Sequence, residues 1–254
     1  MQKFQILTKK YLEKYKKNIW NLEKDFSVFL LNSKELDFDF LTESSSVFSS
    51  NIEWNSLDLN SFMNLKLQNK KASKDVLEIE NLIKAYRFAQ KNKLTEKNLL
   101  YTHKLASETL LIESKRWIYR NEKVWVFWAE GLVYLAVEEE LVEQEMKKLF
   151  IDIKNLLEKK LSLEEIFYYA SLIHLKFVHI HPFSDWNWRI ARLLEKWFLA
   201  EKLWKDLWKL KSEQFYKENR KNYYKNINLW VNYYELNYDN CIDFLLMLRE
   251  SLKS

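Results

Sequence analysis

Hydrophobic residues recur at helical spacing along most of this chain. In residues 73–92, for example, apolar side chains return every three or four positions and form one broad face. Ser73 stands at a helix N-cap position, and Ser162 with Glu165 has the spacing of a capping box. The pattern therefore predicts an all-α protein with helices over about 2–31, 73–92, 95–113, 138–159, 162–178, 187–203, 212–227 and 233–248.

One stretch, residues 118–134, departs from the helical pattern. Val124 and Val126 lie two positions apart, as on a strand, and Asn121 with Glu122 fits a turn. An isolated two-stranded hairpin is only marginally stable in water. We therefore expect a short β-hairpin that packs against the helices.

Residues 32–50 are the predicted linker. Their first part is acidic, at 37–39, and their second part is rich in serine, at 44–46 and 49–50. We find no internal repeat and no low-complexity tract elsewhere in the chain.

Composition indicates a packed protein without internal disulfides. The 254 residues are 48% hydrophobic and 30% charged, which suits one domain or a core with a small extension. The 41 basic and 36 acidic residues are spread along the chain, which favours a solvated, mildly basic surface over direct nucleic-acid binding. Cys241 has no partner cysteine, and the apolar runs are too short for a signal peptide or a membrane span. We therefore expect a cytoplasmic protein that enters no membrane.

Glycine and tryptophan occur in abnormal proportions. The chain has a single glycine, Gly131, and 11 tryptophans, whereas glycine normally makes up about 7% of residues. An AT-rich genome lowers glycine and proline together, but it does not raise tryptophan. The excess of tryptophan therefore has another cause.

Segment 179–192 concentrates polar side chains between two predicted helices. Arg189 and Arg192 share a face at a helix start, where free N–H groups and forked guanidinium donors both suit a polyphosphate. Asp185 is a hard oxygen ligand of the kind that Mg²⁺ prefers beside substrate phosphates. His181 is the side chain in this loop that acts as a base near neutral pH. Together they predict attack of a hydroxyl group on a nucleotide phosphate.

This segment resembles the motif of the Fic family, HPFx(D/E)GNGRxxR. The matching residues are His181, Pro182, Phe183, Asp185, Asn187, Arg189 and Arg192. Trp186 and Trp188 stand where the family has glycine. The resemblance implies an all-α Fic-type bundle with a β-hairpin flap, and transfer of AMP from Mg-ATP to a Ser, Thr or Tyr hydroxyl of a target protein. Several Fic-like proteins use other donors or transfer other phosphate-containing groups, so the resemblance leaves the donor open.

The resemblance also implies roles for individual residues. His181 would deprotonate the target hydroxyl, Asp185 would hold Mg²⁺, and Phe183 would anchor the loop. The phosphate and ATP site would consist of Trp186, Asn187, Trp188, Arg189, Arg192, Tyr223 and Tyr224. The flap, about 117–136, would align an extended target segment by strand addition. Its residues near the nucleotide would be Val126, Phe127, Trp128 and Ala129.

A second motif, at 49–55, resembles the family's inhibitory pattern (S/T)xxxE(G/N). Ser49 and Glu53 match it, and Trp54 stands at a possible glycine position. An inhibitory helix at about 43–54 would aim Glu53 at Arg192 and block the γ-phosphate. The same glutamate can support removal of AMP, which would make the enzyme reversible. The alternative is an ordinary surface helix cap.

The tryptophans at 186 and 188 conflict with phosphate binding, because an indole there fills the volume that glycine leaves open. We hypothesise that many tryptophans are glycines, encoded by UGA in a bacterium that reads UGA as glycine. Other tryptophans at glycine-like positions are Trp117, Trp125, Trp128 and Trp204. If Trp186 and Trp188 are real, the chain is instead a non-catalytic Fic-fold interaction module or regulator.

The resemblance divides the chain into residues 1–40, an N-terminal helical extension, and residues 41–254, a Fic-type domain with its active-site loop at 181–192. The expected partner is a target protein that presents a hydroxyl side chain, and a homodimer is left open. His103 and His174 have no metal-like partner spacing, so we interpret both as core residues.

Overall fold

Helices dominate the computed structural model of the chain, which describes residues 4–68, 73–128 and 131–254. The α-helices are α1 (Leu12–Asn18), α2 (Leu22–Ser33), α3 (Phe38–Ile52), α4 (Leu59–Leu67), α5 (Lys74–Ala89), α6 (Glu96–Ser107), α7 (Glu139–Glu158), α8 (Leu163–Ile180), α9 (Asn187–Lys202), α10 (Ser212–Glu218), α11 (Arg220–Ile227) and α12 (Ile242–Glu250). Short 3₁₀ turns are η1 (Glu113–Lys115), η2 (Lys205–Lys209), η3 (Tyr233–Glu235), η4 (Tyr238–Asn240) and η5 (Ser251–Lys253). The strands of the hairpin are β1 (Trp125–Trp128) and β2 (Gly131–Leu135).

Side-chain caps explain where several helices begin. The predicted capping box at Ser162 and Glu165 is confirmed, because each side chain accepts the other's backbone N–H. Ser73 caps α5 and Thr95 caps α6 in the same way, each accepting the N–H three residues on. These bonds satisfy donors that a helix N-terminus otherwise leaves free.

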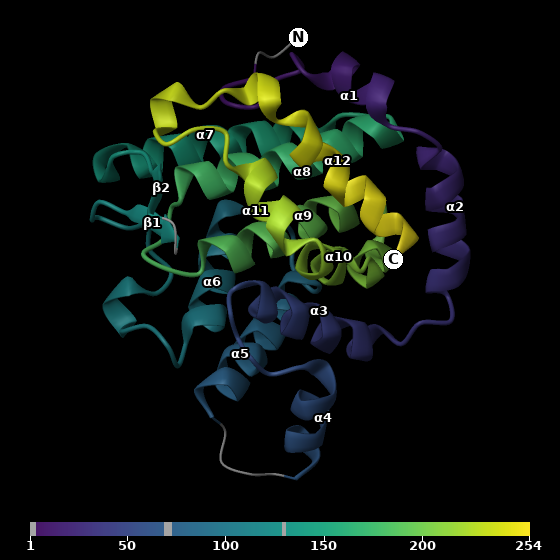
Figure 1. Ribbon diagram of the computed structural model, residues 1–254, viewed down its shortest axis with the longest axis vertical. Helices are drawn as coiled ribbons and strands as arrows, with labels where there is room; N and C mark the ends of the chain where they lie inside the picture. The colour runs from purple at the N-terminus through teal and green to yellow at the C-terminus, as the bar shows by residue number, and fades with distance from the viewer. Residues whose placement is uncertain (1–3, 69–72, 129–130) are drawn as a thin grey trace.

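Helices α8 and α9 occupy the middle of the molecule (Figure 1) and pack closely against each other. Helix α8 is buried around most of its circumference, because α7, α9 and α12 surround it. A helix that is apolar all round is typical of a buried core helix. The loop between α8 and α9 therefore starts and ends on the most firmly packed elements of the fold.

The predicted linker is wrong for residues 38–50, which belong to α3. Asp37 caps this helix by accepting the Phe40 N–H at 2.6 Å. Its serines are buried, and the small side chains let α3 lie against α5 and α10. The Ser46 hydroxyl donates back to the Thr42 carbonyl, four residues earlier. A serine-rich run therefore forms a close-packing helix here instead of a flexible connection.

The predicted N-terminal helix over 2–31 is also wrong as one element. Residues 5–7 are not helical, and their N–H groups donate to the buried carboxylate of Asp152 at 2.8–3.0 Å. Helices α1 and α2 follow, separated at Asn21, whose φ is 55°. Both helices pack on α8, and α1 also packs on α12.

Three other predicted helices are shorter or broken. The helix expected over 95–113 ends as α6 at Ser107, whose hydroxyl donates to the His103 carbonyl. The one expected over 212–227 is divided into α10 and α11 at Asn219, whose side chain donates to the Phe215 carbonyl. The one expected over 233–248 consists of two 3₁₀ turns followed by α12.

The predicted hairpin is confirmed as the antiparallel pair β1 and β2. The predicted turn at Asn121 and Glu122 is wrong, because both strands follow these residues and their connection lies between Trp128 and Gly131. It packs on the helices as expected, because the Tyr134 hydroxyl donates to the His179 carbonyl of α8 at 2.5 Å. Leu135 also donates to the Val231 carbonyl at 2.7 Å. The hairpin is thus held beside the end of α8, at one edge of the molecule (Figure 1).

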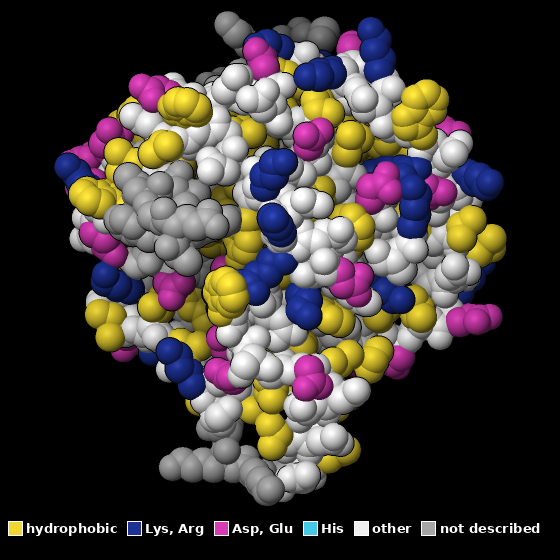
Figure 2. All heavy atoms as spheres, viewed as in Figure 1, with side chains coloured by type: hydrophobic (Ala, Val, Ile, Leu, Met, Phe, Trp, Pro, Cys, Tyr) yellow, Lys and Arg dark blue, Asp and Glu magenta, His cyan; other side chains and the backbone are white. Residues whose placement is uncertain are grey.

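The surface mixes charges of both signs. On the face shown in Figure 2, basic, acidic and hydrophobic side chains are interspersed. In the described part of the chain, no helix combines the length and apolarity that a membrane span needs.

Candidate active site

The loop between α8 and α9 is braced by its own asparagine. The Asn187 side chain accepts the Phe183 N–H at 2.8 Å and donates to the Phe183 carbonyl at 2.7 Å. The Phe183 ring is fully buried and stacks on His103 with centroids 3.8 Å apart. The side-chain amide that the sequence analysis assigned to phosphate binding is therefore engaged within the loop, and Phe183 anchors the loop in the core.

His181 ends α8 in the left-handed region, with φ 52° and ψ 59°. Its Nδ1 lies 3.3 Å from the Val178 carbonyl oxygen. A carbonyl oxygen only accepts, so Nδ1 carries the proton and Nε2 keeps its lone pair. Burial lowers the pKa of His181 from 6.5 to about 4, so the imidazole is neutral near pH 7. A neutral imidazole with a free Nε2 lone pair is the form that can accept a proton.

Arg120, which lies in the segment before the flap, donates hydrogen bonds to the backbone at the start of this loop. Its Nε donates to the His181 carbonyl at 2.7 Å, and its backbone N–H donates to the Pro182 carbonyl at 2.9 Å. A further guanidinium nitrogen donates to the Val137 carbonyl, and the side chain is almost fully buried. Arg120 thus positions the backbone of His181 and Pro182.

Arg192 is completely buried on α9, and each of its three guanidinium nitrogens donates a hydrogen bond. Nε donates to the Ser49 hydroxyl and Nη2 to the Ser49 carbonyl, both at 2.9 Å. Nη1 lies 3.0 Å from the Glu53 carboxylate and 3.1 Å from the Tyr223 hydroxyl. The contact expected between Glu53 and Arg192 is therefore present, and Ser49 of the same motif takes part.

Arg189, one turn earlier on α9, is held by a carboxylate that the sequence analysis did not assign to the site. Its Nε and Nη2 lie 2.9 and 2.8 Å from Glu78 Oε1. Both side chains are mostly buried, with 12% and 11% of their surface exposed. Glu78 belongs to α5, so each of the two motif arginines is paired with an acidic residue from a different helix.

A hollow of about 300 Å³ joins these groups at the start of α9, with Glu53, Glu78, Asp185, Trp186 and Arg189 among its lining residues. The Asp185 carboxylate is exposed there, and its Oδ1 accepts the Trp186 N–H at 2.6 Å. Within the described residues, no group of three or more His, Cys, Asp or Glu side chains could hold a metal by itself. One exposed carboxylate beside a helix N-terminus fits Mg²⁺ that is bound largely through substrate phosphates.

A second, smaller cavity of about 20 Å³ lies next to His181 and is lined by Val126 of β1, Trp188 and Tyr224. The Trp188 ring lies 5.3 Å from the Tyr224 ring and fills the space between α9 and α11. Tyr223 does not line this cavity, because it is buried behind Arg192. The structure therefore brings Val126 and Tyr224 to His181, but it places Tyr223 in the core.

The remaining flap residues are only partly described. Phe127 and Trp128 belong to β1, opposite Leu132 and Gly131 of β2. Ala129, which the sequence analysis placed near the nucleotide, lies outside the described residues.

Three tryptophans have backbone angles that favour glycine. Their φ angles are 71° at Trp54, 55° at Trp117 and 74° at Trp186. In this left-handed region a side chain crowds the following carbonyl, and glycine alone avoids the clash. Trp188 is helical and Trp204 is extended, so the backbone makes no such demand there. All three left-handed tryptophans stand at positions where the motifs have glycine.

Two site residues were missed or undervalued in the sequence analysis. Glu78 falls in a regular helix and gave no local signal, because its partner Arg189 is 111 positions away. His103 was interpreted as a core residue, and it is fully buried, but its Nε2 also contacts the Asp185 carbonyl at 3.3 Å. Its Nδ1 accepts the Trp117 N–H at 3.2 Å. His103 therefore links the motif loop to the segment before the flap.

Comparison with known proteins gives one matching family model and several similar structures. Residues 93–199 match the sequence model of the Fic/DOC family. No curated protein sequence matches the chain. A Fic family protein from Desulfovibrio desulfuricans has a similar structure, with a TM-score of 0.77 and 19% identity over 99% of this chain and 76% of that chain.

Two further solved structures are similar. A Fic domain containing signaling protein from Bacteroides thetaiotaomicron has a TM-score of 0.70 and 19% identity, over 92% of this chain and 94% of that chain. Fic-1 from C. elegans has a TM-score of 0.64 and 17% identity, over 96% of this chain and 69% of that chain. These similarities confirm the expected all-α Fic-type fold with a short hairpin. Residues 93–199 therefore carry a Fic/DOC family domain, which includes the whole loop at 181–192.

Proposed function

We propose that this protein transfers AMP from Mg-ATP to a Ser, Thr or Tyr hydroxyl of a target protein. The observation that carries the proposal is the placement of His181 beside the N-terminus of α9, with its Nε2 lone pair free and its imidazole neutral. The backbone N–H groups of the first turn of α9 and the two motif arginines lie at the same helix start. This combination supports a base next to a polyphosphate site.

In the proposed step, the target hydroxyl oxygen attacks the α-phosphorus of ATP and forms the new P–O bond. The bond to the diphosphate breaks, and diphosphate leaves. The hydroxyl proton passes to His181 Nε2. Arg189 and Arg192 balance the charge of the phosphates. Mg²⁺, held at Asp185 when bound, would neutralise phosphate charge and orient the leaving group.

The same contacts support a restrained enzyme. Glu53 and Glu78 neutralise Arg192 and Arg189, so both phosphate-binding cations are paired within the chain. Arg192 is fully buried, and leaving it unpaired is costly. A phosphate that binds either arginine must therefore displace the carboxylate that is paired with it. We propose that withdrawal of Glu53 on α3 is the step that opens the site, and that the same glutamate could support AMP removal.

The proposal includes that the natural protein has glycine at positions 186 and 188. The Trp186 indole covers the Arg189 guanidinium, with 4.8 Å between that group and the ring centroid. The Trp188 indole occupies the space next to Tyr224. Glycine at both positions would open the hollows on either side of the start of α9. If both tryptophans are present in the natural protein, these indoles favour the second candidate, a non-catalytic Fic-fold interaction module.

The test uses the chain with Trp186→Gly, Trp188→Gly and Glu53→Gly, incubated with Mg-ATP labelled at the α- or the γ-phosphate. We expect α-label, but no γ-label, on the protein itself or on a target. Adding His181→Ala should reduce labelling by about 10²–10⁴-fold, the usual contribution of a positioned base. Thermal unfolding would verify that the His181 variant is folded. Undiminished labelling in that variant would remove His181 from its role.

A further inference from the structure

Most hydrogen bonds of Arg192 go to α3, the helix whose withdrawal opens the site in the proposed function. Three of its hydrogen bonds go to α3, namely to the Ser49 hydroxyl, the Ser49 carbonyl and the Glu53 carboxylate. The fourth goes to the hydroxyl of Tyr223 on α11, at 3.1 Å. If α3 withdraws, Tyr223 is the protein contact that keeps Arg192 in place.

The Tyr223 hydroxyl can hold Arg192 only if its oxygen faces the guanidinium as an acceptor. Arginine has no acceptor atom, so the hydroxyl proton must go elsewhere. His174 Nε2 lies 3.0 Å from this hydroxyl, and both side chains are fully buried. The geometry therefore makes Tyr223 the donor and His174 Nε2 the acceptor. The His174 proton is then on Nδ1.

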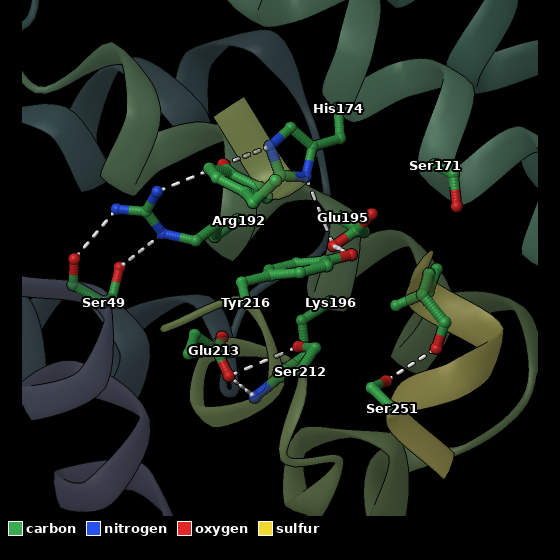
Figure 3. A network of polar contacts seen from close by, with 12 residues as sticks. Ser49, Ser171, His174, Arg192, Glu195, Lys196, Ser212, Glu213, Tyr216 and Ser251 are labelled. Atoms are coloured by element: carbon green, nitrogen blue, oxygen red, sulfur yellow. Dashed lines mark hydrogen bonds and ion pairs between the residues drawn. The ribbon is translucent and has the colours of Figure 1, made fainter. Parts of the chain in front are cut away.

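A buried carboxylate lies next to that Nδ1 atom. Glu195 Oε2 is 3.3 Å from His174 Nδ1, and both side chains are almost completely buried. Figure 3 draws this contact as a dashed line between the two residues. The two atoms are not aligned for a hydrogen bond, so the contact is electrostatic. The Tyr216 hydroxyl donates to the same carboxylate oxygen at 3.0 Å. A negative charge at this position favours a proton on Nδ1 over one on Nε2.

Glu195 and Arg192 stand three residues apart on α9, so the chain of contacts begins and ends on one helix. It runs from Glu195 through His174 of α8 and Tyr223 of α11 back to Arg192. None of its links involves α3. This chain would therefore persist when Glu53 and Ser49 leave the guanidinium.

We propose that Glu195 and His174 are positioning residues that orient the Tyr223 hydroxyl, and that this keeps Arg192 aimed at the nucleotide phosphate in the released state. The inference rests on the proposed function. It assigns a role to His174 beyond the core packing that the sequence suggested. The charged and titratable groups facing His174 are Glu195, Tyr216 and Tyr223, and Arg192 is reached through Tyr223.

The kinetic test uses the released protein, with Glu53→Gly, Trp186→Gly and Trp188→Gly, as the parent. His174→Phe removes the acceptor for Tyr223 and should raise the KM for Mg-ATP about tenfold, as expected for loss of a hydrogen bond to a charged group. His174→Gln offers a carbonyl oxygen to Tyr223 and should recover most of that loss. Tyr223→Phe should raise KM as much as His174→Phe, and the double variant should be no worse than either.

Three outcomes of this test would overturn the inference. One is a KM in the His174→Phe variant equal to that of the parent. Another is a double variant whose loss equals the product of the two single losses, because His174 would then act independently of Tyr223. Equal losses in His174→Phe and His174→Gln, together with equally lowered thermal stability, would indicate a packing role alone and would also overturn it.

A measurement that needs no nucleotide separates this inference from the proposed function. ¹⁵N NMR of histidine side chains in the natural chain should show His174 protonated on Nδ1, with Glu195→Gln reducing that preference. A proton on Nε2 would contradict the inference even if the enzyme is active. If the released parent binds no Mg-ATP, the proposed function fails, and the tautomer then decides the orientation of Tyr223 by itself.

Discussion

The carboxylate of Glu53 lies 3.0 Å from the guanidinium of Arg192, where the end of α3 meets α9. Ser49, one turn earlier on α3, supplies two further acceptors to the same guanidinium. The side chain of Glu53 keeps 14% of its surface exposed, whereas that of Arg192 is fully buried. The glutamate is therefore the more exposed partner of this ion pair, and a phosphate that reaches Arg192 has to displace it.

In the chain with Trp186→Gly and Trp188→Gly, replacing Glu53 by glycine should increase nucleotide binding and transfer. The change removes the carboxylate that competes for Arg192, so we expect affinity for Mg-ATP to rise by about tenfold or more, consistent with loss of a charged hydrogen bond from the competing state. Isothermal titration and α-labelled ATP would measure binding and transfer. Glu35→Gln, on an exposed stretch after α2, is a control that should leave both unchanged. Equal activity in the chains with and without Glu53→Gly would indicate that the motif at 49–55 is an ordinary helix cap.

Glu78→Gln should increase affinity for Mg-ATP independently of Glu53. The glutamine keeps the shape of the side chain but removes the charge that Arg189 now neutralises at 2.8 Å. Because this pair is mostly buried, we expect a gain of about threefold to tenfold. Glu80→Gln, two positions along α5, is the matched control. A Glu78→Gln variant that binds nucleotide more weakly would instead identify Glu78 as a support that holds Arg189 in its binding position.

Glycine at position 54 or 117 should stabilise the fold. Left-handed backbone costs a non-glycine residue about 1–2 kcal/mol. Trp54 makes a cation–π contact with Arg220, and Trp117 makes one with Lys104. Each exposed contact of this kind stabilises the fold by about 0.5–1 kcal/mol, which is less than the cost of the left-handed backbone. Urea unfolding should show a gain of up to about 1 kcal/mol for each change. Trp20→Gly, an exposed site without positive φ, should be neutral or destabilising.

The codons test the same hypothesis directly. If these tryptophans are glycines in the organism, the gene carries UGA at positions 54, 117, 186 and 188, and mass spectrometry of the natural protein finds glycine in the peptide spanning the motif loop. UGG codons at 186 and 188 would exclude the hypothesis. In that case the natural chain should not bind Mg-ATP.

Lowering the pH below about 6.5 should destabilise the fold. Burial lowers the pKa of His103 and His179 to about 3 and that of His181 to about 4, from 6.5 in the unfolded chain. Between these values the unfolded state binds more protons, so stability is complete above pH 6.5 and falls as the pH falls. Each histidine contributes about 1.4 kcal/mol per pH unit to this slope.

Urea unfolding at pH 7.5, 6.5, 5.5 and 5.0 would measure the slope, in a window where carboxylates still contribute little. His179→Gln should reduce the slope by about one proton, whatever its effect on stability at pH 7.5. Stability that is constant from pH 7.5 to 5.0 would show that these histidines are accessible to protons in the folded state.

The helices and the motif loop followed from short-range patterns in the sequence. Helical periodicity, the capping box at Ser162 and the spacing of His181, Arg189 and Arg192 depend on residues within a few positions of one another. Such features persist in any fold that contains the segment, because backbone geometry sets them. The resemblance of the inhibitory motif likewise needed only the spacing of Ser49 and Glu53.

Tertiary packing decided everything that depends on distant partners. The serine-rich stretch looked like a linker, and it becomes α3 because small buried side chains let it lie against α5 and α10. Glu78 meets Arg189 across 111 positions, and His174 meets Tyr223 across 49. No local pattern marks these pairs, since a buried charge or imidazole acquires its role from the groups that surround it after folding. The sequence motifs by themselves predict the chemistry, and the packing of α3, α5 and α11 around α9 determines which groups hold its arginines.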